Sequence, residues 1–91
     1  MKGKFYVVYL KPDPEVNAET VKEAMNKCLD WYKANSTFWI VYTTRDAEGL
    51  YKRFKPCVNE KGRIFIARLD LNDRQGWMGK GFWDWIKKER E

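Results

Sequence analysis

The side chains in this sequence that could bind an anionic ligand are its lysines and arginines, and they are concentrated in the second half of the chain. Lysine and arginine outnumber aspartate and glutamate by 18 to 13, which gives a net charge of +5. Residues 45–68 alone hold seven basic and three acidic side chains. A surplus of this size favours attraction to phosphates without forming a dedicated polybasic arm. Any basic patch is therefore expected in the second half of the chain.

Arg68 is the most informative of these cations because it alternates with two isoleucines in a strand-like run. A charge in an apolar row needs an anionic partner, either a carboxylate or a bound phosphate. Trp39 and Phe65 could stack on bases beside it. The alternative is that Arg68 pairs with a carboxylate across a subunit interface and that both rings belong to the core. The ligand-binding reading predicts a site for nucleic acid or a nucleotide formed by Arg45, Lys52, Arg53, Arg63, Arg68 and Trp39.

Residue types that common catalytic machinery requires are missing. The sequence has no histidine, which excludes Ser-His-Asp triads and imidazole acid–base catalysis. Its only serine, Ser36, falls in a predicted turn, and no phosphate-binding glycine motif is present. Asp70 and Asp73 could bind a divalent cation through their oxygens, but the interpretation that we favour is a solvated turn after the last strand. We expect a protein that is not an enzyme and that has no cofactor and no metal site.

Strand-like and helix-like segments alternate along the first 75 residues. Asn17 and Asp46 can each cap the start of a helix, and Pro56 is expected to end the second helix. The order strand, helix, strand, strand, helix, strand, with both helices on one side of an antiparallel sheet, is the ferredoxin-like α+β plan βαββαβ. The expected strands are 4–10, 31–33, 37–42 and 63–69, with a turn at 34–36 and the first helix running from residue 18 to residue 29.

Both faces of the predicted sheet are largely apolar, since neighbouring residues within 5–10, 38–42 and 64–67 are all hydrophobic. A sheet with one wet face alternates apolar and polar residues instead. Two helices can cover only one face. We therefore expect the aromatic tail, residues 76–91, to pack on the domain formed by residues 1–75 or on a neighbouring subunit, with a helix over 82–90. The expected oligomer-interface residues are Trp77, Phe82, Trp83, Trp85 and Ile86.

The segments "STFWIVYTT", "IFIARLDLND" and "GWMGKGFWDWI" resemble the SinR-like family of small bacterial and phage proteins, distant relatives of the second CRISPR-associated protein. The resemblance covers residues 30–91 and implies a ferredoxin-like protomer that dimerises through its sheet. In the CRISPR-associated relatives it implies nucleic-acid handling, in some cases metal-dependent cleavage by an aspartate that ends the first strand. Leu10 and Lys11 stand at that place here, and Asp13 lies beyond Pro12, so the nuclease residue does not carry over.

The amino-terminal residues and the cysteines indicate in which cellular compartment the protein is expected. The apolar run before Lys11 is too short for a signal peptide or a membrane span. Cys28 and Cys57 lack metal-ligand spacing and suit a reducing cytosol. We expect a cytoplasmic homodimer or larger homo-oligomer, away from membranes, that binds nucleic acid or a nucleotide at a basic, aromatic-lined interface. A protein-binding adaptor or toxin-like partner, and a metal-dependent nuclease, are the alternatives.

Overall fold

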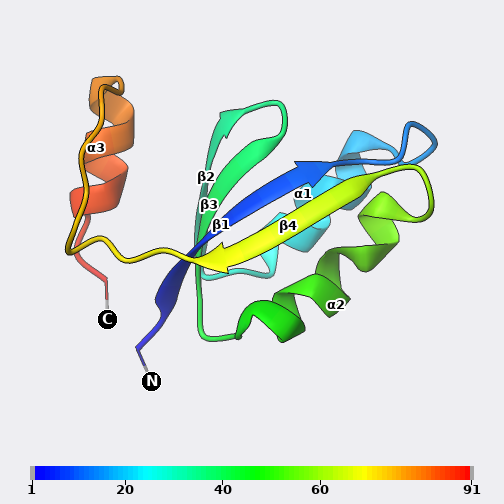
Figure 1. Cartoon of the computed structure of the whole chain (residues 1–91), viewed down its shortest axis with the longest axis horizontal. Coiled ribbons are helices and arrows are strands. Elements are labelled where there is room, and N and C mark those ends of the chain that lie inside the picture. Colours follow the sequence, from blue (N-terminus) through cyan, green and yellow to red (C-terminus); the bar gives the residue numbers. More distant parts are fainter. Residues whose placement is uncertain (1, 91) are drawn as a thin grey trace.

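Runs of β-branched and aromatic residues form the strands, and segments with helical spacing of apolar residues form the helices. The computed structural model describes residues 2–90 as a small α+β protein with a four-stranded antiparallel open sheet and three helices (Figure 1). The elements are β1 (Lys4–Lys11), α1 (Ala18–Asn26), β2 (Asp30–Asn35), β3 (Phe38–Thr43), α2 (Ala47–Val58), β4 (Arg63–Arg68) and α3 (Lys80–Lys87).

The strands lie in the order β2-β3-β1-β4, and every neighbouring pair is antiparallel. Helix α1 connects β1 to β2, which are separated in the sheet by β3. Helix α2 connects β3 to β4, which are separated by β1. Figure 1 shows α1 and α2 together beside the sheet, whereas α3 stands apart beyond one end of it.

The hydrophobic core lies between one face of the sheet and the helices α1 and α2. Val8 and Leu10 of β1 meet Leu50 and Phe54 of α2, and all four side chains are fully buried. Met25 brings α1 into the same cluster. At about 25 cal/mol per Å² of apolar surface, burial of this cluster is the main source of the stability of the fold. We call the opposite face of the sheet the open face.

The helix starts confirm two capping predictions. The Asn17 side chain accepts a hydrogen bond from the Thr20 N–H at 2.9 Å, and the Asp46 side chain accepts one from the Gly49 N–H at 2.8 Å. Each carboxylate or amide oxygen satisfies a backbone donor that has no partner within the helix.

The prediction that Pro56 ends the second helix is wrong, because α2 continues through it to Val58. Pro56 lies in the last turn, where the missing N–H removes one hydrogen bond and no further turn follows to be disrupted. The helix ends instead at Asn59, which has a positive φ of 45° and donates its N–H to the Lys55 carbonyl.

Other element boundaries also differ from expectation. Asn35 accepts a hydrogen bond from the Thr37 N–H at 3.0 Å, which places the hairpin turn at Ser36–Thr37 and lengthens β2. The first helix ends at Asn26 rather than at residue 29, and Leu29 is 62% exposed. Helix α3 begins two residues earlier and ends three residues earlier than expected.

Candidate functional site

The open face is organised in rows that run across the strands, because antiparallel pairing sets one residue of each strand beside its neighbours. Lys11 of β1 pairs with Arg63 of β4, and both side chains are exposed. These two residues form the cationic row at one end of the open face. The Arg63 guanidinium donates only to the adjacent Gly62 carbonyl, at 2.8 Å, among residues 2–90.

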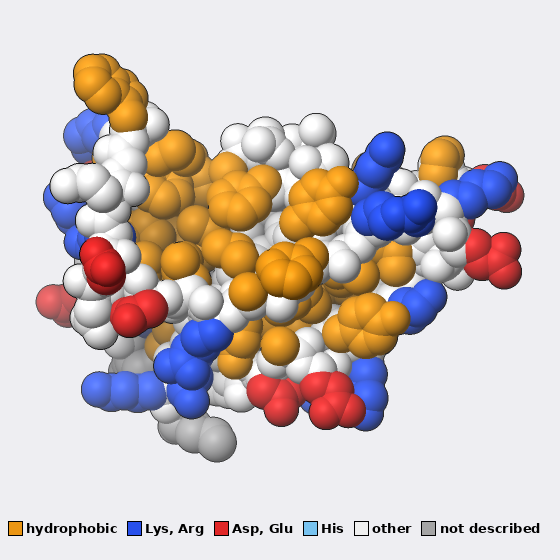
Figure 2. Space-filling model, in the orientation of Figure 1, with side chains coloured by type: hydrophobic (Ala, Val, Ile, Leu, Met, Phe, Trp, Pro, Cys, Tyr) orange, Lys and Arg blue, Asp and Glu red, His pale blue; other side chains and the backbone are white. Residues whose placement is uncertain are grey.

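The next row is aromatic. Tyr9 of β1 pairs with Phe38 of β3 on one side and with Phe65 of β4 on the other. Tyr9 is 39% exposed, Phe65 is 65% exposed and Phe38 is half-buried. Large exposed rings that share one face are unusual, because burial of an aromatic side chain is strongly favourable. We call these three residues the aromatic row; Figure 2 shows the broad field of hydrophobic side chains over the strands to which they belong.

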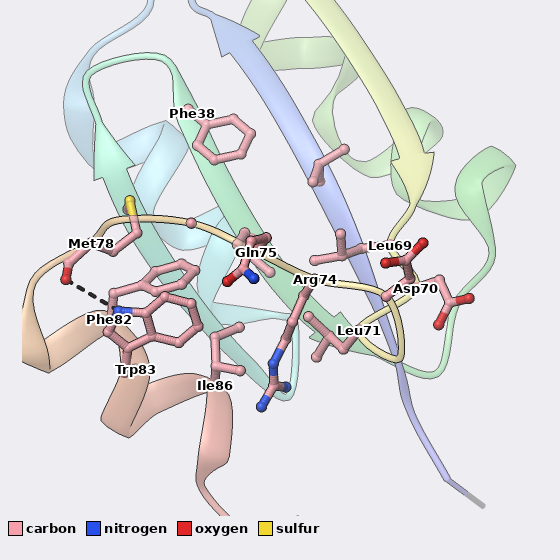
Figure 3. A pocket seen from close by; sticks show the side chains of 14 residues that line it. Phe38, Leu69, Asp70, Leu71, Arg74, Gln75, Met78, Phe82, Trp83 and Ile86 are labelled. Atoms are coloured by element: carbon pink, nitrogen blue, oxygen red, sulfur yellow. Dashed lines mark hydrogen bonds between the residues drawn. The ribbon is translucent and has the colours of Figure 1, made fainter.

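The third row lines the floor of a groove. Val7 pairs with Ile40, and both point to the same face as Tyr9 and Phe38. The segment of residues 69–78 and helix α3 form the walls, and the groove has a volume of about 330 Å³ (Figure 3). Phe38 lines it too, so the groove continues the aromatic row (Figure 3). We call it the tail groove.

The fourth row is covered by α3. Phe5 and Tyr42 pair in the sheet, and their rings lie 5.0 Å apart between centroids. Trp85 of α3 contacts Phe5 edge-on at 5.9 Å, and Phe82 contacts Tyr32 of β2 edge-on at 5.4 Å. The aromatic tail thus covers one end of the open face and leaves the other end uncovered.

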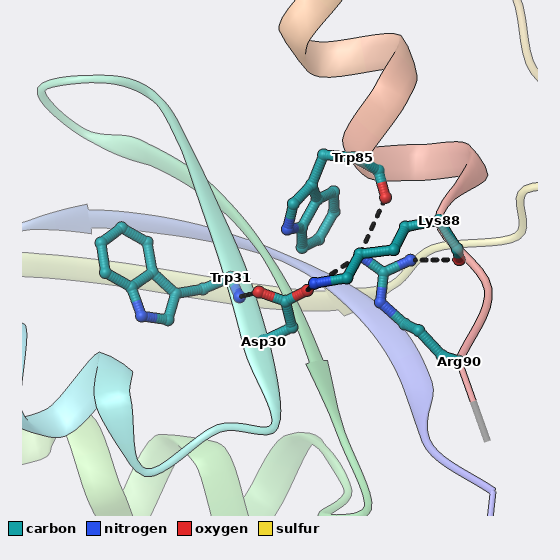
Figure 4. Close-up of polar contacts among 5 residues, drawn as sticks. All are labelled: Asp30, Trp31, Trp85, Lys88 and Arg90. Carbon is teal, nitrogen blue, oxygen red and sulfur yellow. Dashed lines mark hydrogen bonds and ion pairs between the residues drawn. The ribbon is translucent and has the colours of Figure 1, made fainter.

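Arg90 fastens the tail to this end. Its side chain, only 9% exposed, lies over the Trp85 ring at 4.4 Å and donates to the Asp30 carboxylate at 3.0 Å and to the Trp85 carbonyl at 2.8 Å (Figure 4). Lys88 adds a longer ion pair to Asp30 at 3.4 Å. Partial burial raises the pKa of Asp30, but the neighbouring polar group of Trp85, the hydrogen bonds from Arg90 and the Trp31 N–H, and the charge of Lys88 favour the ionised form and outweigh it. The pKa of Asp30 is therefore lower than its ordinary value.

The six residues predicted as one ligand site are not brought together. Arg63 lies on the open face, whereas Trp39 is 3% exposed in the core between the sheet and the helices, with Lys33 over its ring at 5.3 Å. Arg68 points to the helix side of β4, in register with Tyr6, and is exposed. Arg45 is exposed in a loop. Lys52 is exposed on α2 and forms an ion pair with Glu48, and Arg53, also on α2, is half-buried near the Cys28 sulfur.

Four of the five predicted interface residues are at least half-buried within their own protomer, and the fifth, Trp77, is exposed. Ile86 is buried, and Phe82 and Trp85 pack on the protomer's own sheet. Trp83 is half-buried, and its indole N–H donates to the Met78 carbonyl at 3.2 Å. Trp77 is 99% exposed.

Lys11 and Tyr9 were missed by sequence reasoning. Their alternation with Phe5 and Val7 places all four on one face of β1. That periodicity could have grouped them, but it does not say which face the helices cover or which strand lies alongside.

Neither a metal centre nor a bilayer-spanning element stands out in residues 2–90. The Asp70 carboxylate accepts a hydrogen bond from the Asn72 N–H at 2.9 Å in a local turn. Within the same residues, no three His, Cys, Asp or Glu side chains gather so as to hold a metal ion. No helix there combines the length and the apolar character needed to cross a membrane.

Comparisons of the chain with protein-family models, with curated proteins and with solved structures find no match. Function is therefore inferred from the residues of the chain themselves.

Proposed function

We propose that this protein is a non-enzymatic binding module for nucleic acid or a nucleotide ligand, and that the open face of its sheet is the binding surface. One observation carries the proposal: the cationic row of Lys11 and Arg63 lies directly beside the exposed aromatic row on the same face. Cations bind phosphates and rings stack on bases, so the two rows together match the two parts of a nucleotide.

The cations of this surface are available to an external anion. In the described part of the chain, the ion pairs involve other lysines and arginines, and no carboxylate pairs with Lys11 or Arg63. Exposed and unpaired cations gain free energy from a polyanion through the release of its counterions. Phosphate contacts at these positions supply affinity and orientation rather than sequence selectivity.

The test is the binding of fluorescently labelled oligonucleotides, measured by anisotropy over a series of salt concentrations. The double variant Lys11→Gln/Arg63→Gln is compared with Lys22→Gln/Lys27→Gln, which removes the same charge from exposed positions in and next to α1. We expect the open-face variant to bind more weakly and to lower the slope of log K against log salt by about 2, one for each phosphate that is no longer neutralised. Equal effects of the two double variants would contradict the proposal.

We also propose that the protomer follows the ferredoxin-like plan, as the SinR-like resemblance implies. The order β2-β3-β1-β4 supports this, because each of α1 and α2 connects two strands that flank a third. An experimental structure with a different strand order would contradict both the plan and the relationship.

Self-association through the tail is a second proposal, and Trp77 supports it. An indole that is 99% exposed, next to the partly exposed Met78, is typical of an interface anchor. The tail groove begins beside Trp77, at Gly76 and Met78, so a two-fold arrangement can place each Trp77 in the groove of the other copy. Sedimentation velocity should show an oligomer that Trp77→Ser converts to a monomer; a wild-type monomer at high concentration contradicts this.

We propose the cytoplasm as the compartment. Cys28 and Cys57 are both free and buried, as expected for a protein that folds under reducing conditions. Fractionation of expressing cells tests this directly, and recovery of the protein outside the cytoplasm would contradict it.

A further inference from the structure

We infer that the open face takes unpaired bases, so that its ligand is single-stranded nucleic acid rather than a duplex. This inference rests on the proposed function and names its substrate class. It is carried by the register of three aromatic residues on three neighbouring strands.

The aromatic row places three rings on three neighbouring strands. Phe38, Tyr9 and Phe65 come from β3, β1 and β4, which are adjacent in the sheet, and Cα pairing sets them side by side. Adjacent strands lie about 4.8 Å apart, and the three side chains point to the same face. A platform of three rings exceeds what one base covers and offers stacking positions for about three successive bases.

The cationic row fixes the path of the strand. Lys11 lies two residues after Tyr9 in β1, and Arg63 lies two residues before Phe65 in the antiparallel strand β4, so both cations stand at the same end of the row, on the same face, at about 3.4 Å per residue. Bases stacked on the rings therefore have cations on one side and, on the other, the mostly apolar tail groove, whose lining also includes Asp70, Asp73 and Arg74. The sugar-phosphate backbone runs across the strands along Lys11 and Arg63, and the base edges point toward the groove.

The charges favour a polyanion over an apolar partner. An apolar partner on the aromatic row would cover Lys11 and Arg63 as well and remove them from water without a carboxylate to pair with. A phosphate backbone supplies the missing anions. Bases that are already paired and stacked in a duplex do not present their flat faces, so only unpaired bases use the rings.

The experiment compares labelled single strands of mixed-sequence RNA and of DNA, about 12 nucleotides long, with duplexes of the same sequences. The variant Phe65→Ala removes the most exposed ring of the row, and Phe65→Tyr restores a ring. The control is Tyr51→Ala, which removes an exposed ring from α2.

For the wild type we expect tighter binding of single strands than of duplexes. Loss of one stacked base is worth about 1–3 kcal/mol, so Phe65→Ala should weaken single-strand binding about 10- to 100-fold. The salt slope should stay unchanged, because both cations of the cationic row are retained. Phe65→Tyr should bind like the wild type, as should Tyr51→Ala. The RNA and DNA arms decide which of the two sources of unpaired bases is preferred.

Failure of the inference and failure of the proposed function look different. If duplexes bind as well as single strands and Phe65→Ala changes nothing, while Lys11→Gln/Arg63→Gln still weakens binding, the single-strand inference is overturned and the proposed function stands. If no nucleic acid or nucleotide binds, both are overturned. If Phe65→Ala instead dissociates an oligomer that binds no strand, the aromatic row is a contact between copies and the inference is again overturned.

Discussion

The guanidinium of Arg90 donates a hydrogen bond of 3.0 Å to the carboxylate of Asp30, sixty residues earlier in the chain. Asp30 is the first residue of β2, so this contact ties the C-terminal segment to an edge strand of the sheet. It also determines which end of the open face the tail covers. Because the tail is held at that end, the aromatic row at the other end stays uncovered.

Asp30→Asn should destabilise the protein by about 1–3 kcal/mol at neutral pH, because it leaves the nearly buried Arg90 without its charged partner. Urea unfolding monitored by tryptophan fluorescence measures this. Asp84→Asn is the control, since its ion pair with Lys80 is exposed and should change the free energy of unfolding by less than about 0.5 kcal/mol.

The same carboxylate should make stability depend on pH. The pKa of Asp30 is lowered in the folded protein, so its contribution is fully present above its ordinary pKa of about 4 and is lost as pH falls through the lowered value. The difference in free energy of unfolding between wild type and Asp30→Asn should therefore shrink below about pH 4. A difference that stays constant down to pH 2 would show that the pair contributes through packing alone.

Gly62→Ala should destabilise the protein by about 1–3 kcal/mol, because an added Cβ would lie 2.5 Å from the Lys11 carbonyl oxygen and 2.7 Å from the Val58 Cα. Backbone atoms cannot move aside as a side-chain end can. Gly81→Ala, within α3 and with nothing within 4 Å, should instead stabilise the protein by up to about 1 kcal/mol. Thermal unfolding of both variants tests this contrast, and similar melting temperatures would refute it.

Truncation of Trp39 and truncation of Phe65 should change stability by very different amounts. Trp39→Ala should cost about 3–5 kcal/mol of stability, because its ring is buried in the core. Phe65→Ala should change stability by less than about 1 kcal/mol, since the ring is mostly in water. Chemical denaturation gives both values; a large loss for Phe65→Ala would mean that the ring is covered in solution.

Both thiols should react slowly in the native protein. Burial raises the pKa of Cys28 above its ordinary value, although the nearby Arg53 partly opposes this, and burial also raises the pKa of Cys57. Little reactive thiolate is then present at neutral pH. Thiol titration with an aromatic disulfide should be slow for the folded protein and fast for both cysteines in denaturant. Rapid native reaction of either thiol would show that its site opens.

The order of elements follows from local chemistry, and for that reason it could be predicted. Asn17 and Asp46 cap helices through contacts three residues long, and the strands are marked by β-branched and aromatic runs. The prediction for Pro56 was wrong because its rule describes helix interiors, whereas the effect of a proline depends on how much helix follows it. The candidate site depends on contacts that are not local. The sequence does not show which of Trp39 and Phe65 is buried and which is exposed. Only the register of the strands shows which face of the sheet each ring occupies.

The amino-acid sequence alone predicted the order of strands and helices, the capping residues and the apolar character of both sheet faces. It also predicted that the aromatic tail packs on an apolar surface. These depend on residue type and on spacing within a few residues. The tertiary structure alone decided that Lys11 stands beside Arg63, that Tyr9 joins Phe38 and Phe65 in one row, and that Arg90 and Asp30 hold the tail at the other end. Those relationships join residues far apart in the chain, and only the pairing of strands and the packing of helices bring them together.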